Sequence, residues 1–306
     1  MMSRRALLSA ATLSALAAAC SPLKALNGLN RLTPGDGGVK QLVDGAAYGP
    51  DPRQRLDVWA PKSAPGQSWA NLPVIVFFYG GSWNSGLREG YGFAARALSA
   101  RGFVVVVPDY RLVPQVRWPA FVEDGAAAMR WTLANIAGHG GDPARMAVMG
   151  HSAGAHIALL LALDRRWGVA DAIKAAVGLA GPYDFLPFVA GGAADKALGN
   201  AADLRETQPI NFARPDAPPL LLLHGETDTT VLPRNSQRLA NAVTDLGGRA
   251  EVRIYADVGH IGILLALSKP FRGKASALVD ASTFLAGVLD PSSAPVPLPL
   301  PLPPQR

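Results

Sequence analysis

Residues 146–156, Met-Ala-Val-Met-Gly-His-Ser-Ala-Gly-Ala-His, constrain the fold of this chain more than any other stretch. An apolar run passes through Gly150, Ser152 and Gly154 into an alanine-rich segment, which predicts a strand that turns directly into a helix. The two glycines supply the space for that sharp bend. The bend exposes the Ser152 hydroxyl and places the amide N–H of Ala153 at a helix start, where unpaired donors can stabilise an oxyanion. Ser152 is therefore the predicted nucleophile, with a chance occurrence of the pattern as the alternative.

A second glycine-rich segment, Gly80-Gly81-Ser82-Trp83, follows another apolar run. Glycines after a buried strand let the backbone approach a ligand closely, so the N–H groups of Gly81 and Ser82 are predicted to join that of Ala153 in an oxyanion hole. A glycine turn without a catalytic role is the alternative. Trp83 is expected to contact the substrate.

Apolar runs and amphipathic segments alternate along the rest of the chain. This alternation predicts an α/β protein with a mostly parallel central sheet and helices on both faces, and 306 residues suit one catalytic domain over 39–290. Residues 183–218 break the alternation and predict a small partial cap, in which Phe185 and Phe188 either line the substrate pocket or pack in the core. Buried strands are predicted at 74–79, 103–107, 174–180, 220–224 and 252–255, an antiparallel edge strand at 54–59, a turn at 140–143, and helices at 90–100, 119–136, 155–163, 233–246 and 274–288.

A carboxylate is expected beside the serine at the same edge of the sheet. The segment Gly225-Glu226-Thr227-Asp228 follows a predicted strand, and the carboxyl ends of strands face the ligand crevice of open α/β sheets. Asp228 is the preferred acid and Glu226 its competitor. The charged groups of Asp109 and Arg111 are predicted to brace loops near the site rather than to perform chemistry.

The chain from about Gln54 to Leu289 resembles the α/β-hydrolase superfamily, and within it the carboxylesterases and arylformamidases. The likeness rests on Gly-His-Ser-Ala-Gly-Ala-His at 150–156, Gly-Gly-x-Trp at 80–83, Asp-Tyr-Arg-Leu at 109–112 and Gly-Gly-Asp-Pro at 140–143. Tyr79 stands where related esterases usually have histidine, which leaves the anchoring of the glycine loop open.

The resemblance implies a catalytic triad in the chain order serine, acid, histidine. The chain has five histidines, and His260 is the only one after Asp228. The implied triad is therefore Ser152, Asp228 and His260, with His260 in a loop after the last strand. His151 and His156 are interpreted as structural.

The N-terminal residues are typical of an export signal. Arg4 and Arg5 precede a short apolar segment that ends at Ala19, so residues 1–19 are predicted to be a signal peptide and residues 20–38 a tether. Cys20, the only cysteine, follows Leu-Ala-Ala-Ala as in a bacterial lipoprotein processing site, and lipidation there would attach the protein to a membrane. Ordinary cleavage near Ala19 is the alternative. In either case we expect an exported protein, periplasmic or anchored as a lipoprotein.

Composition and motifs argue against a nucleic-acid-binding protein and against an enzyme that uses a metal or cofactor. The formal net charge is +6, but no basic run is interleaved with aromatic residues, so no nucleic-acid partner is expected. No paired metal ligands and no Gly-x-Gly-x-x-Gly after a strand are visible, so no metal and no cofactor are predicted. The last residues, 291–306, contain seven prolines and predict a disordered tail.

Three functions are compatible with these residues. The first is a serine carboxylesterase that hydrolyses short- to medium-chain esters through an acyl-enzyme intermediate. The second is an arylformamidase acting on N-formyl-kynurenine, and the third an anchored binding protein without catalysis. The expected partner is a small-molecule ester.

Overall fold

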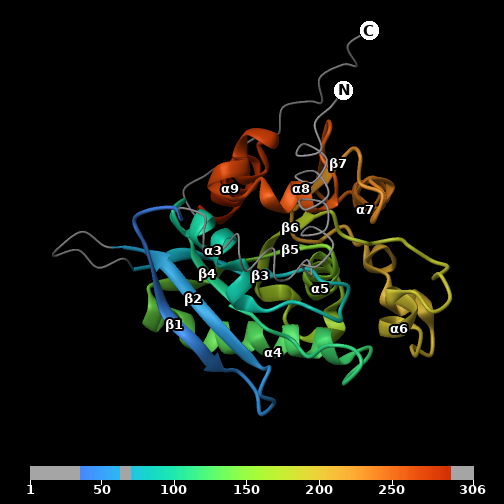
Figure 1. Cartoon of the computed structure of the whole chain (residues 1–306), viewed down its shortest axis with the longest axis horizontal. Helices are drawn as coiled ribbons and strands as arrows, with labels where there is room; N and C mark the ends of the chain where they lie inside the picture. The colour runs from blue at the N-terminus through green and yellow to red at the C-terminus, as the bar shows by residue number, and fades with distance from the viewer. Residues whose placement is uncertain (1–34, 63–69, 291–306) are drawn as a thin grey trace, which may run out of the picture.

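A twisted sheet of eight strands runs through the middle of the residues that the computed structural model describes, 35–62 and 70–290 (Figure 1). Its spatial order is β1-β2-β4-β3-β5-β6-β7-β8. The strands are β1 (Val39–Ala47), β2 (Arg55–Pro61), β3 (Leu72–Phe78), β4 (Val104–Pro108), β5 (Gly141–His151), β6 (Ile173–Leu179), β7 (Leu220–Gly225) and β8 (Ala250–Tyr255).

The sheet is parallel from β4 through β8, whereas β1 and β2 are antiparallel to their neighbours. All residues of β4 and β7 are buried, and their apolar runs at 104–107 and 220–223 are typical of parallel strands that are covered on both faces. The predicted α/β class with a mostly parallel sheet is confirmed.

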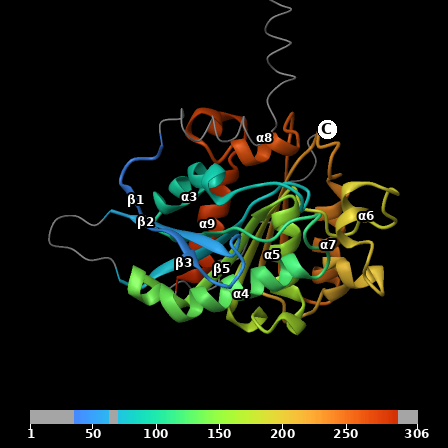
Figure 2. The same cartoon turned by 60° about the horizontal axis from the view of Figure 1, so that its bottom comes forward.

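Helices cover both faces of the sheet (Figure 2). On one face α3 (Gly92–Ser99) packs against α9 (Ala277–Leu289), and on the other α4 (Ala120–Asn135) packs against α5 (Ala153–Leu163). Helix α7 (Arg234–Asp245) lies against β7 and β8. No helix within the described ranges is both long and apolar enough to cross a bilayer.

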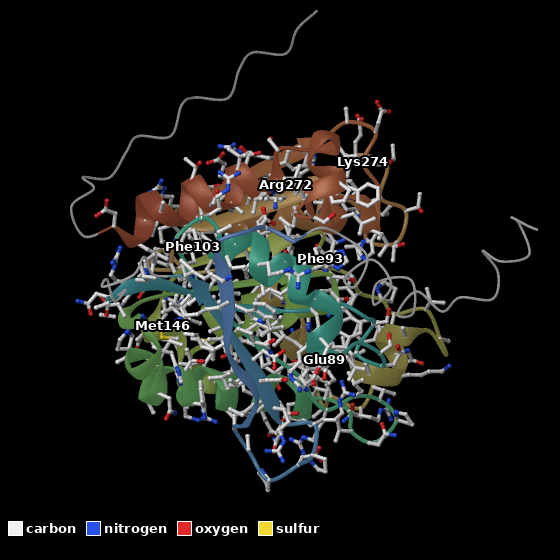
Figure 3. All side chains as sticks on the ribbon, turned by 60° about the vertical axis from the view of Figure 1, so that its left-hand side comes forward. Glu89, Phe93, Phe103, Met146, Arg272 and Lys274 are labelled. Carbon is white, nitrogen blue, oxygen red and sulfur yellow. The ribbon has the colours of Figure 1, made fainter. Side chains whose placement is uncertain are left out.

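Helix α3 and the residue before β4 each contribute an aromatic side chain to the core. Phe93 on that helix and Phe103, just before β4, are both almost completely buried; Figure 3 labels them, together with Arg272.

Arg272 forms an ion pair with Asp36, and the carbonyl of Gly38 accepts a hydrogen bond from the Lys62 amide. The described end of the predicted tether is therefore held against the domain.

Two predictions about the strands were wrong. Strand β2 is not an edge strand, because β1 pairs along its outer side; β1 lacks a regular apolar alternation and its register with β2 shifts twice. Strand β5 already begins at Gly141, inside the predicted turn. The segment 183–218 contains one short helix, α6 (Ala193–Leu198), and two 3-10 turns (Leu204–Thr207 and Pro209–Phe212). The predicted signal peptide, Cys20 and the proline-rich tail lie outside the described residues.

Candidate active site

Ser152 occupies the bend between β5 and α5, with a φ of 53° and a ψ of −123°. A non-glycine residue rarely adopts this conformation, and it persists only where surrounding contacts impose it. Those contacts are tight: a methyl group at Gly150 would come within 2.4 Å of the Gly154 carbonyl oxygen, and one at Gly154 within 2.2 Å of the Phe78 carbonyl oxygen. The strand–serine–helix bend predicted from 146–156 is therefore built on two positions that only glycine can fill.

Three side chains from distant parts of the chain meet at Ser152. The Nε2 atom of His260 lies 2.8 Å from Ser152 Oγ, and its Nδ1 atom lies 2.7 Å from Asp228 Oδ2. Because the carboxylate accepts at Nδ1, that nitrogen carries the proton and Nε2 is free to accept the serine proton. His260 is the first residue of a short helix, α8 (His260–Leu265), and not part of a loop as predicted.

Asp228 is held as an anion. It is 2% exposed, and its Oδ1 accepts hydrogen bonds from the amides of Thr230 and Val231, both at 2.9 Å. Burial by itself raises the pKa of Asp228, but the contacts with His224, His260 and the Val231 amide outweigh it and hold the pKa well below its usual range. The competing acid, Glu226, is exposed and, within the described residues, makes no hydrogen bond to His260.

The predicted oxyanion donors lie beside the serine. Gly81 has a φ of 136° and Ser82 a φ of 52°, and both line the same cavity as Ser152. The carbonyl of Gly81 accepts from the Asn84 and Ser85 amides at 3.0 Å, which closes the loop on itself. Within the described part of the chain, the N–H groups of Gly81, Ser82 and Ala153 have no acceptor.

Tyr79 anchors this glycine loop. Its hydroxyl donates to Asp109 Oδ1 at 2.7 Å and accepts from Arg53 Nη2 at 2.9 Å. Its ring stacks between those of Tyr91 and Tyr110, with centroids 5.1 and 4.7 Å away. The anchoring that the sequence left open is thus provided by a tyrosine instead of a histidine.

Asp109 and Arg111 brace loops, as predicted. Asp109 also accepts from the main-chain amide and the guanidinium of Arg88, and Arg111 pairs with the buried carboxylate of Asp124 at 2.7 Å. Neither Asp109 nor Arg111 lines the cavity at Ser152.

A cavity of about 280 Å³ opens at Ser152. No Asp, Glu, Lys or Arg of the described ranges lines it, so it suits an uncharged group. Sequence reasoning missed most of its walls; Ile261 and Leu264, three positions apart, carried a weak helical signal. The lining residues are Gly80, Gly81, Ser82, Ser85, Gly86, Tyr91, His151, Ser152, Thr230, His260, Ile261 and Leu264.

The predicted substrate contacts of Trp83, Phe185 and Phe188 were wrong for this cavity, because none of them lines it. Trp83 is 5% exposed and stacks on Phe185 at 6.3 Å, and Phe185 contacts Phe188 at 5.4 Å. These rings form an aromatic cluster beneath the site, and the predicted cap 183–218 adds no residue to the cavity wall.

The two histidines interpreted as structural are both buried. His151 donates from Nε2 to the His260 carbonyl at 3.0 Å, and burial, then the nearby His260, lowers the pKa of His151 to about 3. His156 lies against Thr207 O at 2.7 Å, and burial lowers its pKa to about 4. Both rings are therefore neutral at neutral pH. The described ranges contain no group of three His, Cys, Asp or Glu side chains placed to hold a metal.

Comparison with known proteins gives related sequences and structures. A family model named BD-FAE matches residues 56–243. Esterase LipC of Mycobacterium tuberculosis is 34% identical over 207 residues, which cover 60% of this chain and 50% of LipC. Isoprenylcysteine alpha-carbonyl methylesterase ICME of Arabidopsis thaliana is 30% identical over 268 residues, which cover 79% of this chain and 61% of ICME. The chain therefore spans between half and about three fifths of the length of these relatives.

A solved structure shares the whole fold. The thermostable carboxylesterase EstE1, cloned from a metagenomic library, has 25% sequence identity and a TM-score of 0.72, and the match covers 89% of this chain and 99% of EstE1. A truncated carbohydrate esterase from gut microbiota also has a TM-score of 0.72, at 21% identity, over 84% of this chain and 99% of that one. The architecture is that of the α/β-hydrolases.

Proposed function

The chain belongs to the BD-FAE family and has the α/β-hydrolase fold, and from this premise we propose that it is a serine carboxylesterase acting on short- to medium-chain esters. One observation carries the proposal: His260 contacts Ser152 Oγ at 2.8 Å and Asp228 Oδ2 at 2.7 Å. That geometry suits a base that takes the serine proton while a carboxylate holds its tautomer.

In the proposed reaction, His260 Nε2 takes the proton of Ser152 as Oγ attacks the ester carbonyl carbon. The carbonyl oxygen becomes an oxyanion, held by the N–H groups of Gly81, Ser82 and Ala153. His260 then gives its proton to the leaving alcohol, which leaves an acyl group on Ser152. A water molecule attacks that acyl group, with His260 again as base, and the acid and free serine are released.

The cavity supports small, uncharged ester groups. Its volume of about 280 Å³ lies just below the roughly 300–1,000 Å³ of typical ligand pockets, and its described lining contains no Asp, Glu, Lys or Arg. Among the relatives, ICME is named a methylesterase and LipC an esterase. We propose that one side of the scissile ester is a short alkyl or acyl group.

A substrate series tests the activity. Nitrophenyl esters from acetate to dodecanoate, assayed beside N-formyl-kynurenine, should be hydrolysed fastest at the short end. The variant Ser152→Ala should lose about 10⁴-fold or more in kcat and should no longer react with a fluorophosphonate probe. Formamide hydrolysis above all ester rates would make the protein an arylformamidase, and a wild type inert to the probe would make it a binding protein.

We also propose that the protein is exported and anchored through a lipid on Cys20, on the support of the charged and apolar residues that precede this cysteine. In a bacterial host, radiolabelled palmitate should enter the full-length protein, and Cys20→Ser should abolish the label. An unlabelled wild type in the extracellular or periplasmic fraction would instead indicate ordinary signal cleavage.

A further inference from the structure

A second histidine contacts the carboxylate that holds His260. His224, near the end of β7, is completely buried, and its Nε2 atom lies 3.2 Å from Asp228 Oδ2. This is the same oxygen that contacts His260 Nδ1 at 2.7 Å. One carboxylate oxygen therefore lies between two imidazole rings.

The neighbours of His224 determine which nitrogen carries its proton. Nε2 lies 2.8 Å from the carbonyl oxygen of Val231, and a carbonyl can only accept, so Nε2 must carry a hydrogen. Nδ1 lies 2.8 Å from Ser236 Oγ on α7, and the serine hydroxyl can donate to it. The Nε2–H group lies closer to Val231 O, at 2.8 Å, than to Asp228 Oδ2, at 3.2 Å. Its positively polarised hydrogen faces both oxygens.

These contacts also restrain the loop that carries Asp228. The Val231 amide donates to Asp228 Oδ1, and the Val231 carbonyl accepts from His224. His224 thus contacts both the loop backbone, at the Val231 carbonyl, and the carboxylate oxygen that His260 also contacts. A histidine that only filled the core would need Val231 and Ser236 but no contact with Asp228.

We propose that His224 is a positioning residue for the reaction proposed above: its Nε2–H, aimed by Ser236 and Val231, keeps Asp228 directed at His260. Among the contacts that oppose the effect of burial on the pKa of Asp228, that with His224 ranks ahead of that with His260. Within the described residues, the other titratable side chains beside the triad are His151, at the end of β5, whose ring centroid is 4.9 Å from that of His260, and Tyr91, which lines the same cavity.

Removal of the His224 Nε2–H donor should change the electrostatic environment of His260 in a predictable direction. Without Nε2–H, more negative charge on Oδ2 faces His260, so the imidazolium form is favoured and His260 keeps its proton to higher pH. His224→Leu should therefore move the acidic limb of the kcat/KM profile on nitrophenyl acetate upward by about half a pH unit. Its kcat should fall about tenfold, less than the roughly 10²- to 10⁴-fold that a general base contributes, with little change in KM.

His224→Gln is the conservative variant, since its amide can present an N–H at similar reach. It should keep the limb at the wild-type pH and recover most of kcat, whereas Ser236→Ala, which frees the ring, should fall between wild type and His224→Leu. His156→Leu is the matched control: it also removes a buried histidine bound to a carbonyl, but it should lower the melting temperature without moving the limb.

The outcomes separate this proposal from the esterase assignment. If the wild type neither reacts with a fluorophosphonate nor hydrolyses esters, the proposed function fails, and an NMR titration of the His260 ring in wild type and variants still tests the positioning. If that titration and the acidic limb are unchanged in His224→Leu, or in Ser236→Ala when the leucine variant does not fold, His224 is only a core residue. A limb that moves to lower pH would also overturn the proposal.

Discussion

At the scale of single residues, Tyr79 links the catalytic loop to a buried charge network. Its hydroxyl lies between Asp109 and Arg53, and Arg88 bridges Asp109 to the carboxylate of Asp57 at 2.7 Å. Burial raises the pKa of the Tyr79 hydroxyl, which therefore stays a donor. The position of the oxyanion loop thus depends on a hydrogen bond made behind it.

Tyr79→Phe is expected to cost stability more than activity. The variant leaves Asp109 without one donor and Arg53 without one acceptor, so the free energy of unfolding should fall by about 1–3 kcal/mol. The ring stacking against Tyr91 and Tyr110 remains, so kcat should fall by less than about tenfold, well below the cost of a lost oxyanion donor. Urea denaturation and ester hydrolysis measure the two effects.

Tyr255→Phe is the control for this prediction, because Tyr255 also donates to a carboxylate, that of Asp280, and neither residue lines the cavity. It should lower stability with no change in kcat. A Tyr79→Phe enzyme as stable as wild type would show that the hydroxyl does not anchor the loop.

At the scale of elements, the packing of α5 on β3 places the nucleophile. All eleven residues of α5 are buried, and the first turn of this helix touches the β3 backbone at the carbonyls of Phe78 and Tyr79. Such close approach requires a glycine at position 154, because any Cβ there would enter the backbone of the strand.

Replacing glycine by alanine should therefore have opposite effects on stability in helices α5 and α9. Gly154→Ala should destabilise the protein by about 1–3 kcal/mol or more through overpacking, and it should lower esterase activity because the serine bend must shift. Gly287→Ala in α9, where a Cβ meets nothing within 4 Å among the described residues, should stabilise it by about 0.5–1 kcal/mol with activity unchanged. Thermal unfolding of both variants checks the pair; equal shifts would contradict the assigned helix packing.

At the scale of the whole molecule, buried neutral histidines make stability depend on pH. The pKa of His156 is about 4 in the folded chain, below its ordinary value of 6.5. Between these values the unfolded chain binds a proton that the folded chain does not, so acidification favours unfolding. His151, with a pKa of about 3, acts in the same direction.

The free energy of unfolding should fall as the pH is lowered from about 6.5 towards 4, by up to about 1.4 kcal/mol per pH unit for each such histidine. His156→Gln, which keeps a donor for Thr207 O but does not titrate, should remove one histidine's share of that slope. Urea denaturation at several pH values measures it. Identical slopes in the variant and the wild type would show that His156 is not held neutral.

The sequence determined what depends on neighbouring residues. Apolar runs long enough to be buried on both faces defined the parallel strands, and Gly150, Ser152 and Gly154 defined the bend, because backbone sterics act over a few residues. The order serine, acid, histidine that the family resemblance implies indicated His260, because it is the only histidine after Asp228.

Only the tertiary structure decided the contacts made across the sheet. Asp228 and Glu226 follow the same strand two residues apart, and the course of the loop alone buries one and exposes the other. The outer strand β1, the helix that starts at His260, the cavity walls, and the contacts of His224 and Tyr79 likewise depend on segments that are distant along the chain. Their packing is set by which surfaces the folded sheet leaves uncovered, and no local pattern of residues encodes that.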